Sequence, residues 1–256
     1  MKLPLILLSG FVVVLLGTAL INFLIIKNTG SPVAVPETPR GAEQYDNSGS
    51  SETGIPLTYA LLGDSTTVSQ GGDYDKGYAR GTARYLASQG YAVTFYNFGV
   101  SGARAADIAE SQAPQAAKVR PDIVLISVAA NDVTHLTAIK DIEASLQSSI
   151  NTLRAARPEV KIVLTGSAQM GSIPRFPQPT RLIAKLRVAQ INNMVRQLVA
   201  REDVTFAPIA DKTGPIFAAR ADELYASDKF HPNTIGYEVW TPVLNDALGA
   251  ALAKTD

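Results

Sequence analysis

An apolar run passes directly into a glycine, an acid and a serine in the stretch Leu57-Thr58-Tyr59-Ala60-Leu61-Leu62-Gly63-Asp64-Ser65-Thr66. The run Leu57–Leu62 predicts a strand, and Gly63 predicts a turn at its end. A serine at that point can present its hydroxyl at the edge of a sheet, close to a helix N-terminus whose N–H groups favour negative charge. Ser65 is therefore a candidate nucleophile. Taken alone, it could equally cap a helix or help to bind a phosphate.

Apolar runs and helical spacings alternate along the rest of the chain. Further strands are predicted over Tyr91–Tyr96, Ile123–Val128, Val160–Leu164 and Val204–Phe206. Helices are predicted over Tyr78–Ser88, over 138–156, within 180–201, and from Pro232 to about Ala253. Strands separated by helices predict an α/β fold with a parallel sheet covered by helices on both faces. In such folds ligands lie beyond the carboxyl ends of the strands.

Two more short blocks follow predicted strands and offer hydrogen-bond donors. The first is Asn97-Phe98-Gly99-Val100-Ser101-Gly102, and the second is Ala129-Ala130-Asn131-Asp132. The side-chain amide of Asn131 can donate to a developing oxyanion, and Gly102 lets a backbone N–H approach the same oxygen without obstruction. Each residue could also be an ordinary turn residue.

A fourth block, Asp228-Lys229-Phe230-His231-Pro232, supplies a base. A serine hydroxyl is a poor nucleophile until a base takes its proton. The chain has two histidines, His135 and His231, and only His231 has an acid three residues before it. Asp228 can orient the imidazole and stabilise its charged form. A phosphate-binding module would not need the pair of Asp228 and His231. The other histidine, His135, is expected to be a solvated loop residue.

With these four blocks, residues 57–250 resemble the SGNH/GDSL hydrolase family. The resemblance implies a three-layer α/β/α fold with a mainly parallel sheet and flavodoxin-like topology. It also implies a serine esterase or lipase in which Ser65 attacks, Asp228 orients His231, and the oxyanion is held by the Ser65 N–H, the Gly102 N–H and the Asn131 side chain. The chain departs from the family pattern at Thr66, which replaces a leucine, and at Ala129, which replaces a glycine and could narrow the pocket.

The N-terminal region predicts a different environment from the domain. Residues 3–26 carry no charge, and at about 1.5 Å per residue a helix of this length crosses a hydrocarbon core. We expect residues 1–27 to be an uncleaved membrane anchor, or a cleaved signal segment, that places the domain outside the cytoplasm. Residues 28–56, rich in proline, glycine and serine, predict a flexible linker, and residues 57–256 the catalytic domain.

Composition restricts the chemistry further. The chain has no cysteine, which excludes disulfides, thiolate metal sites and cysteine nucleophiles. The formal net charge is zero, and no basic surface for nucleic acid is indicated. No metalloprotease or phosphate-loop motif is present, so no metal and no cofactor are expected. Ile173 and Phe176, in the proline-rich segment Gly171–Pro179, could form a wall of the substrate pocket or belong to an ordinary surface loop.

The expected function is serine-dependent hydrolysis of small acyl esters through an acyl-enzyme on Ser65. The candidate substrates are O-acetyl groups of envelope glycans and lipid esters. Three alternatives remain open: a glycan O-acyltransferase that uses the same site, a non-catalytic module that binds a glycan or a phosphate, and a peptidase.

Overall fold

The computed structural model describes Gly17, residues 33–34, residue 37, residues 41–46 and residues 54–253. One six-stranded sheet crosses the domain in the order β1-β3-β2-β4-β5-β6. Its strands are β1 (Glu43–Tyr45), β2 (Ile55–Gly63), β3 (Tyr91–Asn97), β4 (Ile123–Ser127), β5 (Lys161–Leu164) and β6 (Thr205–Phe206). All five strands expected from the sequence are therefore present, with ends that differ by one or two residues.

The five strands from β2 to β6 are parallel, as expected. β2 lies between β3 and β4. The next strand along the chain, β3, is therefore added on one side of β2, and the later strands β4, β5 and β6 are added on the other side. This arrangement is the flavodoxin-like order, and its switch point lies between β2 and β4. Ser65 follows β2 directly, so it lies at the carboxyl end of the sheet, beside the switch point.

The edge strand β1 makes the sheet mixed, and the sequence did not predict it. β1 pairs antiparallel with β3, and Gln44 lies opposite Thr94. It falls inside the segment interpreted as a flexible linker, because three residues in a proline-rich context give too little periodicity for a strand. Tertiary contacts hold it instead: Glu43 accepts a hydrogen bond from Arg80 Nε at 2.8 Å, and Tyr45 packs on Phe95.

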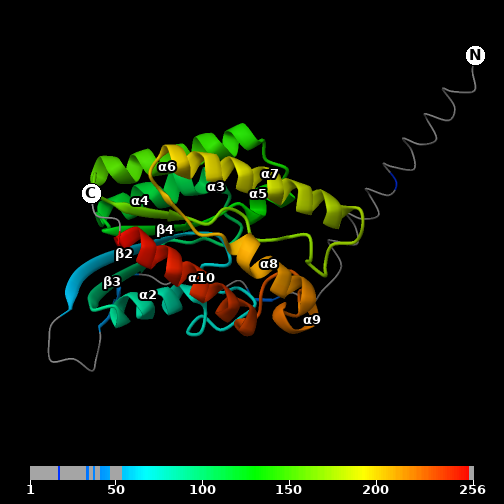
Figure 1. Ribbon diagram of the computed structural model, residues 1–256, viewed down its shortest axis with the longest axis horizontal. Helices are drawn as coiled ribbons and strands as arrows, with labels where there is room; N and C mark the ends of the chain where they lie inside the picture. Colours follow the sequence, from blue (N-terminus) through cyan, green and yellow to red (C-terminus); the bar gives the residue numbers. More distant parts are fainter. Residues whose placement is uncertain (1–16, 18–32, 35–36, 38–40, 47–53, 254–256) are drawn as a thin grey trace, which may run out of the picture.

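Helices cover both faces of the sheet, which confirms the three-layer fold (Figure 1). One layer contains α3 (Ala105–Asp107), the π-helix η1 (Ile108–Gln112), α4 (Ala113–Lys118), α5 (Ala130–Thr134), α6 (Ile139–Ala156) and α7 (Thr180–Arg201). The other contains α2 (Tyr78–Ser88), α8 (Ile209–Ala219), α9 (Ala221–Leu224) and α10 (Thr234–Ala253). The four predicted helices correspond to α2, α6, α7 and α10, whereas the shorter helices were not predicted.

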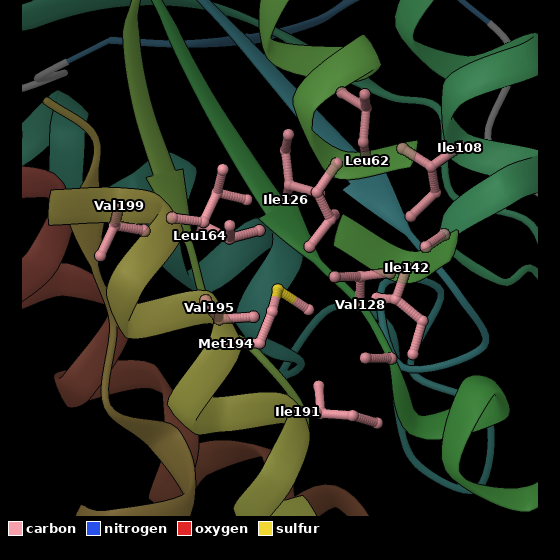
Figure 2. Close-up of a cluster of buried hydrophobic side chains, with 14 of the residues drawn as sticks. Leu62, Ile108, Ile126, Val128, Ile142, Leu164, Ile191, Met194, Val195 and Val199 are labelled. Carbon is pink, nitrogen blue, oxygen red and sulfur yellow. The ribbon is translucent and has the colours of Figure 1, made fainter. Parts of the chain in front are cut away.

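Two apolar cores hold the layers together. Leu61 and Leu62 are both fully buried and belong to opposite cores, as expected for a strand covered on both faces. Figure 2 shows the core beneath α6 and α7, which is built by strand side chains and by helix side chains that include Leu62, Ile126, Leu164, Ile142, Ile191, Met194 and Val195. These cores fix the carboxyl ends of β2 and β4, on which the candidate site is built.

The predicted anchor over residues 3–26 lies outside the described residues, apart from Gly17. In the part of the chain that the structure describes, no helix combines the length and the apolar character needed to cross a membrane.

Candidate active site

The turn that carries Ser65 is held from both sides. Gly63, the last residue of β2, donates its N–H to Gln112 Oε1 at 2.8 Å, and its carbonyl accepts from Gln112 Nε2 at 2.9 Å. A Cβ at Gly63 would lie 2.2 Å from the carbonyl oxygen of Ser127, so only glycine fits. On the other side, Asp64 Oδ1 accepts hydrogen bonds from the N–H and the hydroxyl of Thr66, both at 2.9 Å. The position of Ser65 is therefore fixed by the distant Gln112 and by its chain neighbours Asp64 and Thr66.

The structure brings Ser65, His231 and Asp228 together. Ser65 Oγ lies 2.9 Å from His231 Nε2, and His231 Nδ1 lies 2.6 Å from Asp228 Oδ2. With the Nδ1 proton directed at the carboxylate, Nε2 is free to accept the serine proton. The other carboxylate oxygen, Asp228 Oδ1, accepts the N–H groups of Phe230 at 2.9 Å and His231 at 3.0 Å. Asp228 is buried, so it is held in one orientation.

A tight loop presents His231 to the serine. Ala226 donates its N–H to the His231 carbonyl at 2.8 Å, and Lys229 donates to the Ala226 carbonyl at 2.9 Å. Lys229 has a φ of +56°, which reverses the chain sharply enough for Asp228 and His231 to face each other. The ring of Phe230 stands edge-on to the imidazole, with 5.0 Å between the ring centroids, and restricts its rotation.

The pKa values of the two buried aspartates of the site, Asp228 and Asp64, are shifted in opposite directions. Burial raises the pKa of Asp228, but hydrogen bonds from His231 and from the loop N–H groups outweigh it, so the net pKa is lowered. Burial also raises the pKa of Asp64, and there the Thr66 donors compensate only in part, so the net pKa is raised. Asp228 therefore remains a carboxylate that can stabilise a charged imidazole, whereas Asp64 resists ionisation.

Asn131 lies in the first turn of α5, on the pocket side of the serine turn. Its Nδ2 donates one hydrogen to the Ala103 carbonyl at 3.0 Å, which leaves the second amide hydrogen for another acceptor. This bond ties α5 to the loop that contains Gly102, which has a φ of +86° and open space where a Cβ would be. Gly102 is not among the residues that line the described pocket, whereas Ser65 and Asn131 are.

Ala129 does not narrow the pocket, contrary to the expectation from the family pattern. It is buried and lies outside the set of pocket-lining residues. Its φ is +85°, in the left-handed region that glycine adopts without steric cost. Replacing glycine at this position therefore costs backbone strain and leaves the width of the pocket unchanged.

A pocket of about 530 Å³, part of it open to solvent, adjoins the serine. Its walls are mostly apolar and aromatic and consist of Ser65, Thr66, Ala130, Asn131, Ala168, Gln169, Met170, Ile173, Thr213, Gly214, Phe217, Tyr225, Phe230, His231, Pro232 and Trp240. Ile173 lines it, but Phe176 does not. Phe176 is buried behind Phe230, with 5.8 Å between the ring centroids. The walls from α8 and α10 were not predicted, because α8 was not predicted as a helix and no motif in α10 marks the residues that reach the pocket.

No cluster of three histidine, aspartate or glutamate side chains arranged to hold a metal ion occurs among the described residues. A serine, an imidazole and a carboxylate in hydrogen-bond contact, beside an amide donor and an apolar pocket, are the groups that acyl transfer requires. The fold and this arrangement define a class, the α/β serine hydrolases that act on carboxylic esters.

The chain belongs to the GDSL-like lipase/acylhydrolase family, which residues 61–239 match. This match confirms the resemblance inferred from the four sequence blocks, and it places the chain among the carboxylic ester hydrolases.

Similar proteins agree with this assignment. GDSL-like esterase Rv1075c of Mycobacterium tuberculosis is 27% identical over 135 residues, which cover 52% of this chain and 42% of that protein. The chain therefore matches less than half the length of this relative. Among solved structures, TesA superposes with a TM-score of 0.63 at 19% identity, covering 76% of this chain and 99% of TesA. The psychrotrophic esterase EstA from Pseudoalteromonas sp. gives 0.60 at 18% identity, covering 77% and 100%. These two structures share the fold.

Proposed function

We propose that this chain hydrolyses small acyl esters through an acyl-enzyme on Ser65. The observation that carries the proposal is the 2.9 Å contact between Ser65 Oγ and His231 Nε2, which joins residues 166 positions apart in the sequence. A helix cap or a phosphate-binding turn would not require this contact. The buried Asp228 on the far side of the imidazole supports the same assignment.

In the first half-reaction, Ser65 Oγ attacks the ester carbonyl carbon while His231 Nε2 takes the serine proton. Asp228 stabilises the imidazolium that results. The negative charge that forms on the carbonyl oxygen is stabilised by the N–H groups of Ser65 and Gly102 and by the free amide hydrogen of Asn131. The C–O bond to the alcohol then breaks, and His231 returns the proton to the leaving oxygen.

In the second half-reaction, water takes the place of the alcohol. His231 Nε2 removes a proton from the water, and the hydroxide attacks the acyl-serine carbonyl. The same donors stabilise the second oxyanion. Breaking the bond to Ser65 Oγ releases the carboxylic acid and restores the serine hydroxyl, with the proton supplied by His231.

The shape of the pocket supports a small acyl group as substrate. Phe217, Tyr225 and Trp240 line it with aromatic rings, and Ile173 adds an aliphatic side chain. The substrates proposed for such a site are O-acetyl groups of envelope glycans and lipid esters. An acetyl xylan esterase, AlAXEase, shares the fold at 19% identity and a TM-score of 0.60. The uncharged run over residues 3–26 supports placing the enzyme at a membrane with its domain outside the cytoplasm.

The test compares the full chain with Ser65→Ala on p-nitrophenyl acetate, butyrate and octanoate. We expect turnover on the short esters, and its loss in the variant. The control Ser88→Ala changes an exposed serine at the end of α2 and leaves turnover intact. A structure of EstA has been described as inhibited by monoethylphosphonate. We expect a phosphonate ester to label Ser65 in this chain as well, seen as a mass increase on the peptide that contains it.

Each alternative predicts a different result. An acyltransferase would hydrolyse esters slowly until a sugar acceptor is added, and then transfer the acyl group to it. A binding module would retain a glycan ligand in Ser65→Ala and turn nothing over. A peptidase would cleave the corresponding anilides. Equal inactivity of the wild type and Ser65→Ala on all three esters would count against the proposed hydrolase.

A further inference from the structure

The first turns of α7 carry exposed apolar side chains. Leu182 is 53% exposed, Ile183 49% and Leu186 58%. Positions i, i+1 and i+4 lie on one side of a helix, so these three side chains form one surface, which we call the apolar lip. Figure 1 shows the start of α7 extending past the end of the sheet, at the end where α8 and α9 lie. Exposed apolar surfaces of this kind mark interaction sites.

Basic side chains alternate with the apolar lip along the helix. Arg181 donates from Nε to the Phe176 carbonyl at 3.1 Å, Arg187 donates to the Thr137 carbonyl, and Lys185 is exposed. None of these three cations pairs with a carboxylate in the described part of the chain. Residues 162–201 contain no aspartate or glutamate. Asp211 lines the same surface hollow as Lys185, but it pairs with Arg196 at 2.6 Å, so the three cations beside the lip have no ion-pair partner among the described residues.

The apolar lip adjoins the entrance to the candidate active site. A Cβ at Gly171 would lie 2.9 Å from Cβ of Lys185, so the loop before α7 packs directly on the lip helix. Gln169, in the same loop, lines both the site pocket and an open hollow that reaches Lys185. Gly214 of α8 also lines both. The lip and the mouth of the pocket therefore share one side of the domain.

We propose that the apolar lip, with Arg181, Lys185 and Arg187, docks this domain on an anionic phospholipid surface. Apolar side chains enter the boundary between headgroups and acyl chains, while the cations meet anionic headgroups. The two contributions act together, and each basic side chain near such a surface strengthens binding about fivefold. The charge decides the occupant, because a neutral apolar partner would leave three cations without counter-charges. Docking in this way turns the mouth of the pocket towards the membrane. The docking itself does not depend on the reaction proposed for Ser65.

The absence of cysteine makes a direct test available. Leu182→Cys in the full chain is labelled with a polarity-sensitive fluorophore and reconstituted with phosphatidylcholine vesicles, with or without phosphatidylglycerol. We expect a blue shift with the anionic vesicles, and its loss as salt screens the charges. The matched control is Ile55→Cys. Ile55 is an apolar residue that is 66% exposed, and it lies at the start of β2, the end away from Ser65. Its emission is expected to stay constant.

A charge reversal separates docking from general adsorption. Lys185→Glu removes a cation and adds an anion at the lip. We expect the apparent affinity for anionic vesicles, measured from the shift at position 182, to fall more than tenfold. Lys118→Glu makes the same change at an exposed lysine of α4 and is expected to leave the shift unchanged. Equal shifts at positions 182 and 55 would overturn the proposal. So would a shift without vesicles that grows with protein concentration, which would indicate a second copy of the chain.

Discussion

Gln112 holds the backbone of Gly63 with both ends of its side-chain amide, accepting from the N–H at 2.8 Å and donating to the carbonyl at 2.9 Å. Gln112 is buried and lies at the end of the π-helix η1, whereas Gly63 is the last residue of β2. Ser65 follows two residues later. A side chain 49 positions away in sequence therefore bonds both backbone polar groups of the last residue before the serine turn.

Replacing Gln112 with alanine is expected to loosen this turn. The buried Gly63 N–H loses its partner, whereas the Gly63 carbonyl still accepts from the Val100 N–H at 3.0 Å, so the free energy of unfolding should fall by about 2 kcal/mol. Because Ser65 is then less well positioned, kcat should fall while KM changes little. Urea unfolding and steady-state kinetics on a short ester measure the two effects. Gln89→Ala is the control, since Gln89 is exposed and should leave both quantities unchanged.

Asn131→Ala should weaken the stabilisation of the oxyanion. The lost amide donor is expected to lower kcat about 10²- to 10³-fold with little change in KM. Since Asn131 also donates to the Ala103 carbonyl, thermal unfolding must be measured in parallel. An unchanged kcat in a folded variant would remove Asn131 from the proposed oxyanion site. Asn151→Ala, on the exposed face of α6, serves as the control.

Asp228→Asn should disable the imidazole without removing it. The amide favours the wrong tautomer of His231, and kcat should fall by about 10⁴-fold. The lowered pKa of Asp228 also predicts a pH effect on stability. A lowered acid pKa contributes stability above its unfolded value near 3.9 and loses it as the pH falls through the folded value. The stability advantage of the wild type over the variant should therefore shrink in acid.

Asp64 should behave in the opposite way, because its folded pKa is raised by burial. Asp64 contributes to the stability of the fold when its carboxyl is protonated, and this contribution is lost as the pH rises through the folded pKa. Asp64→Asn removes this titration and keeps an oxygen for the Thr66 donors. The free energy of unfolding of the variant, relative to the wild type, should therefore rise over the pH range above the unfolded pKa near 3.9. A difference that stays flat across this range would contradict the assigned direction.

The chemistry of this site was easier to predict from the sequence than its supports and walls. Strands β2 and β4 are continuous apolar runs, and each ends at a polar block, so Ser65 and Asn131 could be placed without a structure. Gln112 could not be placed. It belongs to a short helix interrupted by a π turn, and nothing in its local sequence points to Gly63.

The pocket walls of α8 and α10 illustrate the same limit. The helix α8 was not predicted, and for the predicted helix α10 the residues that reach the serine depend on how the helix packs across the sheet. Phe217 and Trp240 line the pocket for this reason, and no motif marks them. The edge strand β1 likewise depends on Arg80 and Phe95, which lie far along the chain.

Ile173 and Phe176 were both candidates for a wall of the substrate pocket, with an ordinary surface loop as the alternative, and their different positions predict different phenotypes. Ile173 touches the pocket, so Ile173→Ala should enlarge it and raise kcat/KM for octanoate relative to acetate by about tenfold or more. Phe176 is buried behind Phe230, so Phe176→Ala should instead leave a cavity and lower the free energy of unfolding by about 3 kcal/mol or more. Its chain-length profile should change less than that of Ile173→Ala. The p-nitrophenyl ester series and urea unfolding, applied to both variants, distinguish these outcomes. A larger change in chain-length preference for Phe176→Ala than for Ile173→Ala would show that the wall is assigned to the wrong residue.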